Sequence, residues 1–107
     1  MTTFDKREAG EEGKFALDAE MEFRARARRD KLVGHWAAGK MGLAGAAADA
    51  YAAALVTTDF EERGDGDVIR KLKADFKAKN VDVSDHQIER TLAEKMAEAV
   101  NELKAKG

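Results

Sequence analysis

Residues 83–103 read VSDHQIERTLAEKMAEAVNEL and carry the clearest helix signal in the chain. Ser84 can cap the free backbone amides at a helix start while Gln87 reaches back toward it. Val83 can pack on Ile88 as a hydrophobic staple. From there apolar residues recur at helical spacing to the end of the chain: Ile88, Leu92, Met96, Ala99, Val100 and Leu103. We therefore expect an amphipathic helix over 85–105.

Three earlier segments show the same spacing, and we expect helices near 16–42, 46–62 and 67–79. The predicted inner faces are Met21, Ala25, Arg28, Leu32 and Trp36 in the first helix, Ala48, Tyr51, Ala52, Leu55 and Val56 in the second, and Val68, Ile69, Leu72 and Phe76 in the third.

The ends of these helices carry local signals of their own. Gly42 indicates a Schellman-type end of the first helix, and Gly64 is the natural C-terminal glycine of the second. Asn80 tolerates the left-handed conformation that follows a helix end, so the third helix should stop there. Asp65 or Asp67 can cap the start of the third helix.

Composition and connection lengths together indicate an all-α protein, a four-helix up-down bundle. The chain has 107 residues, of which 37% are charged, and it has no proline. The three connections are short, which favours antiparallel neighbours. We assign residues 15–107 to the bundle and residues 1–14 to a flexible arm, because the arm mixes charges closely and has Phe4 as its only large apolar side chain.

The first predicted helix has apolar residues on two sides. Phe23 and Ala27 fall opposite its main stripe, so the helix is either sandwiched between neighbours or keeps one face for a partner. Gly34 and Gly39 inside it should each cost roughly 1 kcal/mol relative to alanine. The usual compensation is the close approach of another helix.

Several function classes are excluded or disfavoured by what the chain contains. It has no cysteine, which excludes thiol catalysis and thiolate metal sites. His35 and His86 have no partner at a recognised metal spacing, and Ser84, the only serine, is assigned to capping. We expect no catalytic residues, no metal site and no enzymatic activity. The net charge of -2 argues against a general nucleic-acid partner, and no segment is apolar enough for membrane insertion. A cytoplasmic location is expected.

The most unusual polar feature is the run of arginines between residues 24 and 29. Residues 23–40 carry six cations against Asp30 alone. Arg28 falls almost within the apolar stripe, so we expect it to be partly buried and to need a carboxylate or a bound anion. One interpretation is a salt bridge to Asp59 or Glu61. The alternative is a phosphate or nucleotide seat beside Trp36 or Tyr51, and the local sequence does not decide between them.

The order of several motifs is more telling than composition. They are Thr3-Phe4-Asp5-Lys6-Arg7-Glu8, Lys14-Phe15-Ala16, Ala27-Arg28-Arg29-Asp30-Lys31-Leu32, Gly34-His35-Trp36-Ala37-Ala38, Gly42-Leu43, Asp59-Phe60-Glu61-Glu62 and Val83-Ser84-Asp85-His86-Gln87-Ile88. In this order and spacing the whole chain resembles the zeta subunit of the α-proteobacterial F-type ATP synthase, a small inhibitor protein.

The resemblance implies a four-helix bundle with an inhibitory N-terminal arm that wedges between the α, β and γ subunits of the catalytic head and blocks ATP hydrolysis. The protein would then lie at the inner membrane only through the synthase. The positions that match the inhibitory arm are Phe4, Asp5, Lys6, Arg7, Glu8, Lys14 and Phe15. The family is also associated with ADP or ATP as a regulatory ligand of the bundle, with no other cofactor. For such a ligand Arg24, Arg28 and Trp36 are the candidate contacts.

The arm departs from the family pattern just after Glu8. Inhibitory relatives tend to continue with a more helical stretch that holds another phenylalanine, whereas this chain has Ala9-Gly10-Glu11-Glu12-Gly13. Two glycines weaken a helix, and no aromatic replaces the missing one. The sequence therefore predicts weakened inhibition. The alternative is an adenine-nucleotide-sensing or adaptor bundle whose arm inhibits nothing.

Overall fold

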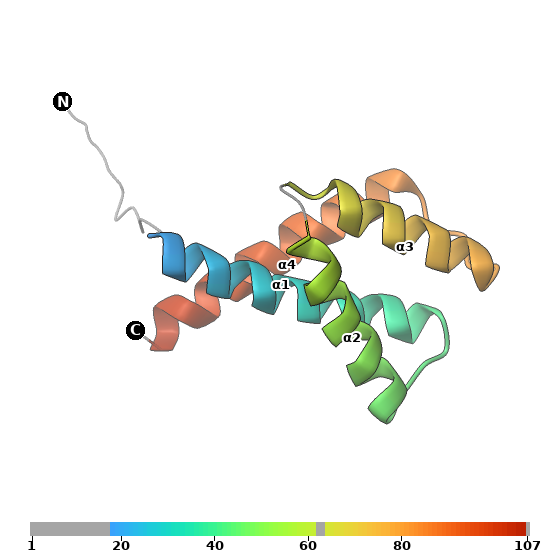
Figure 1. Ribbon diagram of the computed structural model, residues 1–107, viewed down its shortest axis with the longest axis horizontal. Coiled ribbons are helices and arrows are strands. Elements are labelled where there is room, and N and C mark those ends of the chain that lie inside the picture. Colours follow the sequence, from blue (N-terminus) through green and yellow to red (C-terminus); the bar gives the residue numbers. More distant parts are fainter. Residues whose placement is uncertain (1–17, 62–63, 107) are drawn as a thin grey trace.

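The computed structural model describes residues 18–61 and 64–106 and consists of four α-helices (Figure 1). They are α1 (Ala19–Lys40), α2 (Gly45–Asp59), α3 (Gly66–Ala78) and α4 (Asp85–Lys106). Within the described residues there is no β-strand, so the predicted all-α fold is confirmed. The arm predicted for residues 1–14 lies outside the described residues.

Helix α1 is the centre of the bundle. It packs extensively against α2 and α4, while α3 makes smaller contacts with α2 and α4. Figure 1 shows each helix reversing the direction of the one before it, with α2 crossing α1 obliquely. This is the predicted up-down connectivity. Helix α1 therefore lies between two neighbours, as the sandwiched interpretation requires, but Phe23 on its second apolar side stays exposed.

Two helices end as their local sequences predict. After α1, Gly42 has φ 81° and the amide of Leu43 donates to the carbonyl of Ala38 at 2.8 Å, which is a Schellman end. After α3, Asn80 adopts φ 59°, and the amide of the next residue again reaches back into the last turn. In both cases a single residue that accepts positive φ stops the helix.

The start of α4 confirms the predicted cap. The Ser84 Oγ accepts a hydrogen bond from the amide of Gln87 at 3.1 Å. Ile88 is fully buried, and Val83 packs against the core cluster that contains it. These contacts fix the angle at which the chain enters α4.

Two other predicted boundaries are wrong by about three residues. Helix α1 begins at Ala19, because Asp18 is its N-cap and accepts a hydrogen bond from the amide of Met21. Helix α2 ends at Asp59, with Phe60 as its C-cap, before the predicted end at residue 62. Gly64 does have positive φ, at 79°, but it lies in the connection to α3.

The core is built from residues of all four helices. Its buried members are Val33, Ala37, Leu55, Val68, Leu72, Phe76, Ile88 and Leu92. The predicted inner faces of α2, α3 and α4 supply most of them. The predicted face of α1 is confirmed at Ala25 and wrong beyond it, since the other buried side chains belong to Arg29, Asp30, Val33, Ala37 and Ala38. Leu32 and Trp36 lie at the edge of the core, half-buried.

The two glycines inside α1 differ in their surroundings. A Cβ added to Gly34 would lie 2.5 Å from the Cα of Ala52, so the backbones of α1 and α2 approach too closely for any side chain there. A Cβ added to Gly39 would meet nothing within 4 Å. Close helix packing therefore explains Gly34 and leaves Gly39 unexplained.

None of the helices in the described part of the chain is long and apolar enough to cross a membrane.

Candidate functional site

A buried ionic cluster joins the first three helices where α2 ends and α3 begins. The Arg29 guanidinium donates to Asp30 Oδ1 at 2.8 and 3.0 Å and to Asp59 Oδ2 at 3.3 Å. It also pairs with Asp65 Oδ1 at 3.0 Å. Arg26 donates to the other oxygen of Asp59 at 2.7 Å. Asp30 and Asp59 are completely buried, so a buried arginine binds carboxylates from three parts of the chain.

The cluster holds three carboxyl groups against two guanidinium groups. Burial and the nearby Asp59 together raise the pKa of Asp30 to about 8, against the lowering effect of Arg29. Among the described residues the Oδ2 atom of Asp30 has no hydrogen-bond partner, so no donor there stabilises a negative charge on it. A neutral Asp30 leaves two carboxylates and two guanidinium groups, a balanced set.

Two other charged residues of the cluster, Arg29 and Asp65, are also affected by its buried surroundings. Burial alone would lower the pKa of Arg29, but Asp30 and Asp65 outweigh it, and the pKa is raised above its ordinary value. Asp65 is the N-cap of α3, yet its side chain makes no capping hydrogen bond because it is engaged by Arg29. The cluster therefore ties the start of α3 to α1 in place of a conventional cap.

Next to this cluster two aromatic rings are stacked on the surface. The rings of Phe23 on α1 and Phe60 at the end of α2 have centroids 4.5 Å apart and an interplanar angle of 23°. They stay 56% and 38% exposed. The guanidinium carbon of Arg26 lies 5.6 Å from the centroid of the Phe60 ring. The ionic cluster and the aromatic pair thus form one continuous structure through Arg26.

The predicted partner of Arg28 is wrong. Its side chain is 46% exposed, and it pairs with Glu102 on α4 at 2.8 Å, not with Asp59 or Glu61. Its neighbour Arg29 occupies the buried position and takes Asp59. Along a helix one residue corresponds to a rotation of 100°, so the predicted stripe was displaced from the true inner face by one position.

The three nucleotide candidates are not gathered in one place. Arg24 is exposed and pairs with Glu20 at 2.8 Å. Arg28 lines a cavity of about 330 Å³ together with Ala99, Glu102 and Leu103. Trp36 lies two turns further along α1 and contacts Phe76 edge-to-face, with ring centroids 5.6 Å apart. The structure therefore brings Arg28 into a cavity to which neither Arg24 nor Trp36 contributes.

Tyr51, the other aromatic considered beside a phosphate seat, is engaged within the bundle. Its hydroxyl donates to Asp75 Oδ2 at 2.7 Å, and Lys71 lies 5.0 Å from its ring centroid. Burial and the hydrogen bond to Asp75 raise the pKa of Tyr51. The ring helps line a further cavity of about 290 Å³ with Met41 and Leu43.

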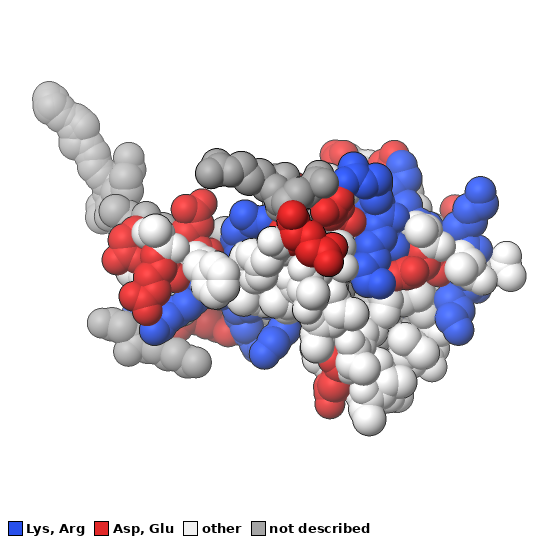
Figure 2. Space-filling model, viewed as in Figure 1, with Lys and Arg blue, Asp and Glu red and all other residues white. Residues whose placement is uncertain are grey.

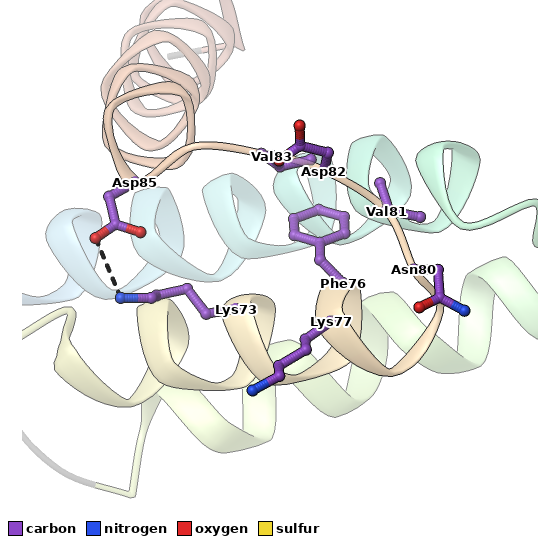
Figure 3. A pocket seen from close by; sticks show the side chains of 8 residues that line it. All are labelled: Lys73, Phe76, Lys77, Asn80, Val81, Asp82, Val83 and Asp85. Atoms are coloured by element: carbon purple, nitrogen blue, oxygen red, sulfur yellow. Dashed lines mark hydrogen bonds and ion pairs between the residues drawn. The ribbon is translucent and has the colours of Figure 1, made fainter.

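A larger open cavity of about 370 Å³ lies between α3 and the connection to α4 (Figure 3). The side chains around it are Lys73, Phe76, Lys77, Asn80, Val81, Asp82, Val83 and Asp85. Lys73 pairs with Asp85 at 3.1 Å, as the dashed line in Figure 3 shows. The lining carries two cations and two anions, so it has no net charge to attract a phosphate.

No group of side chains within residues 18–61 and 64–106 is arranged to hold a metal ion. His35 lies 3.6 Å from Asp49 at the surface, on the edge of α1 that faces α2. The arm candidates Phe4, Asp5, Lys6, Arg7, Glu8, Lys14 and Phe15 all lie outside the described residues.

Sequence reasoning missed the ionic cluster and the aromatic pair. A signal for the first was the run Ala25, Arg29, Val33 and Ala37, which is a regular i, i+4 series. A signal for the second was Phe23, which falls on the side of α1 opposite the predicted stripe. Neither signal named its partner, because Asp59 and Phe60 are more than 25 residues away in sequence.

Comparisons with known proteins agree with the resemblance found in the motifs. The family model of the ATPase inhibitor subunit zeta matches residues 1–102, which include the arm and nearly all of the bundle. A protein solved by NMR in solution is 39% identical in sequence, with a TM-score of 0.71. The match covers 81% of this chain and 99% of that one. No curated protein matches the chain.

Proposed function

Because the chain belongs to the family of the ATPase inhibitor subunit zeta, we propose that it inhibits ATP hydrolysis by the catalytic head of the F-type ATP synthase. The observation that carries the proposal is the extent of the family match, which runs through residues 1–17 as well as through the four helices. The protein is then a regulator and not a catalyst, and it works in the cytoplasm beside the membrane-bound synthase.

In this proposal the arm is the inhibitory element and the bundle is its carrier. Phe4 and Phe15 are the apolar anchors, and the charged residues between them contact the α, β and γ subunits beside the rotating shaft. A charged segment with few apolar anchors makes most of its contacts with its partner, so its affinity should depend strongly on the two phenylalanines. The buried ionic cluster keeps α1 fixed to α2 and α3, which gives the arm a rigid base.

Inhibition by this chain should be weak, owing to Gly10, Gly13 and the absence of an aromatic between them. The test is ATP hydrolysis by the purified head, measured as the protein concentration is raised. We expect inhibition that becomes complete only at high concentration and that is lost in the Phe4→Ala variant. The Glu94→Ala variant, changed on the exposed side of α4, is the control and should inhibit normally. No inhibition at any concentration would favour the adaptor alternative.

We also propose that the bundle binds ADP or ATP weakly at the basic edge of α1, in the cavity beside Arg28, although Arg24 and Trp36 do not line this cavity. The support is the cavity beside Arg28 and the excess of arginine on this part of the helix. Glu20 and Glu102 already pair with these arginines and would compete with a phosphate, which is why the affinity should be low.

Amide chemical shifts followed during an ADP titration test the nucleotide site. We expect the largest changes between residues 24 and 36, and their loss in the Arg28→Gln variant. Changes confined to Lys77, Asn80 and Val81 would move the site to the cavity between α3 and α4. If no amide shift of the bundle changes even at high ADP concentration, the bundle does not bind the nucleotide.

A further inference from the structure

The stacked pair Phe23 and Phe60 has no role in the core. Both rings keep a large part of their area in solvent even though they cover one another, and they are the large apolar side chains that the described residues leave exposed. Exposed aromatic area has a hydration cost that burial against a partner removes. Such rings are also the side chains most often responsible for affinity in protein interfaces.

The pair is held in place from beneath. Asp59 is completely buried and fixes Arg26 through a 2.7 Å hydrogen bond, and Arg26 in turn lies against the ring of Phe60. Asp59 is itself fixed by Arg29 inside the ionic cluster. A surface aromatic with this support loses little freedom on binding, so more of its contact energy appears as affinity.

Around the pair the acidic side chains outnumber the basic ones, because Arg26 is already paired with Asp59 and Arg24 with Glu20. Asp18, Glu20 and Glu22 stand on the first turn of α1, and Glu61 follows Phe60 directly. Figure 2 shows acidic side chains gathered over the start of α1, beside uncharged surface. A partner that fits this patch presents an apolar side chain bordered by lysine or arginine.

The position of the pair indicates which partner this is. Phe23 follows Asp18 by five residues, which is about 7.5 Å along the axis of α1. Residues 1–17 lead directly into this turn. A head that holds the arm therefore has its own surface within reach of both rings.

We propose that Phe23 and Phe60 form a second docking site for the ATP synthase head. On the outside of the head, the two rings would contact an apolar patch that is bordered by basic side chains. This rests on the proposed function, and it adds a contact made by the folded bundle to the contact made by the arm. The bundle then contributes to affinity directly, and its exact placement on the head is set by the aromatic pair.

Binding of the full chain to the purified head, with and without the Phe23→Ala and Phe60→Ala changes together, tests the site. We expect the dissociation constant to rise about 30-fold, the usual effect of removing an aromatic hot spot. The Glu22→Lys variant should bind about threefold more weakly, as expected for an exposed charge pair, while Glu94→Lys on α4 should bind normally. Circular dichroism melting should show that all variants keep the bundle.

Failure of this inference is distinguishable from failure of the proposed function. Unchanged affinity of the double alanine variant, with inhibition by the unmodified chain intact, would overturn the docking site alone. Binding that depends on both rings, without inhibition, would retain the docking site and overturn the inhibitory role. Absence of any binding by the unmodified chain would overturn both.

A photo-crosslinking amino acid, p-benzoylphenylalanine, in place of Phe23 identifies the occupant independently of affinity. We expect a crosslink to a head subunit, and none from the same group in place of His86. Glu102, near the end of α4, pairs with Arg28 in the first half of α1, and His86 lies about 24 Å from Glu102 along the axis of α4. A crosslink only within the same chain or to a second copy would show that a different segment covers the rings, and would overturn the proposal.

Discussion

The Asp59→Asn variant should be about 3–5 kcal/mol less stable than the unmodified chain, measured as the free energy of unfolding in a denaturant titration. Asp59 is the carboxylate that Arg26 and Arg29 share, at 2.7 and 3.3 Å, and it is completely buried. Removing its charge leaves Arg29 enclosed with too few anionic partners. The penalty is that of an uncompensated buried charge and not that of a lost surface contact.

Asp30→Asn is the matched control, because it changes an equally buried carboxyl group in the same cluster. With a pKa of about 8 the Asp30 carboxyl is mostly neutral at pH 7, and an amide reproduces both its shape and its charge. We expect a change well below that of Asp59→Asn. An equal loss of stability in the two variants would contradict the assignment of the proton to Asp30.

Comparing the unmodified chain with Asp30→Asn also gives the direction in which the free energy of unfolding changes with pH. The pKa of Asp30 is raised from 3.8 when unfolded to about 8 when folded, so between these values the folded state binds the extra proton. Its contribution to stability is greatest at low pH and falls as the pH rises toward 8, by at most about 1.4 kcal/mol per pH unit. The stability difference between the unmodified chain and Asp30→Asn should show this fall, and it should level off above pH 8.

The second large effect is expected in the arm. Changing Gly10 and Gly13 to alanine and Glu11 to phenylalanine should strengthen inhibition of ATP hydrolysis a few hundred- to a few thousand-fold, on the order of 3.5–5 kcal/mol. Each glycine costs about 1 kcal/mol if the bound arm is helical, and an enclosed aromatic adds about 1.5–3 kcal/mol of burial.

The melting temperature of the bundle is the control for the arm variant. It should stay within a few degrees, because the three changes lie outside the four helices. Strong inhibition by the unmodified chain, or no gain from the triple change, would show that the bound arm is not helical at these positions.

The sequence by itself determined the helices and most of their ends. The stop at Gly42, the stop at Asn80 and the cap at Ser84 each depend on two or three neighbouring residues, so they could be predicted from a short window. The inner faces of α2, α3 and α4 followed from periodicity, since each of these helices has one dominant apolar stripe. The family followed from the order of motifs along the whole chain.

Only the tertiary structure decided which face of α1 is buried and what its charges contact. Helix α1 packs against both α2 and α4, so two of its faces satisfy the same periodicity, and a shift of one residue exchanges Arg28 for Arg29. The local sequence pattern of α1 also does not indicate which distant residue each of its side chains contacts. Asp59 reaches Arg29, and Phe60 stacks on Phe23, where the end of α2 lies against the first half of α1, and the two helices are in close contact at Gly34 and Ala52. Such pairings depend on how helices cross, which is fixed by packing across the whole bundle.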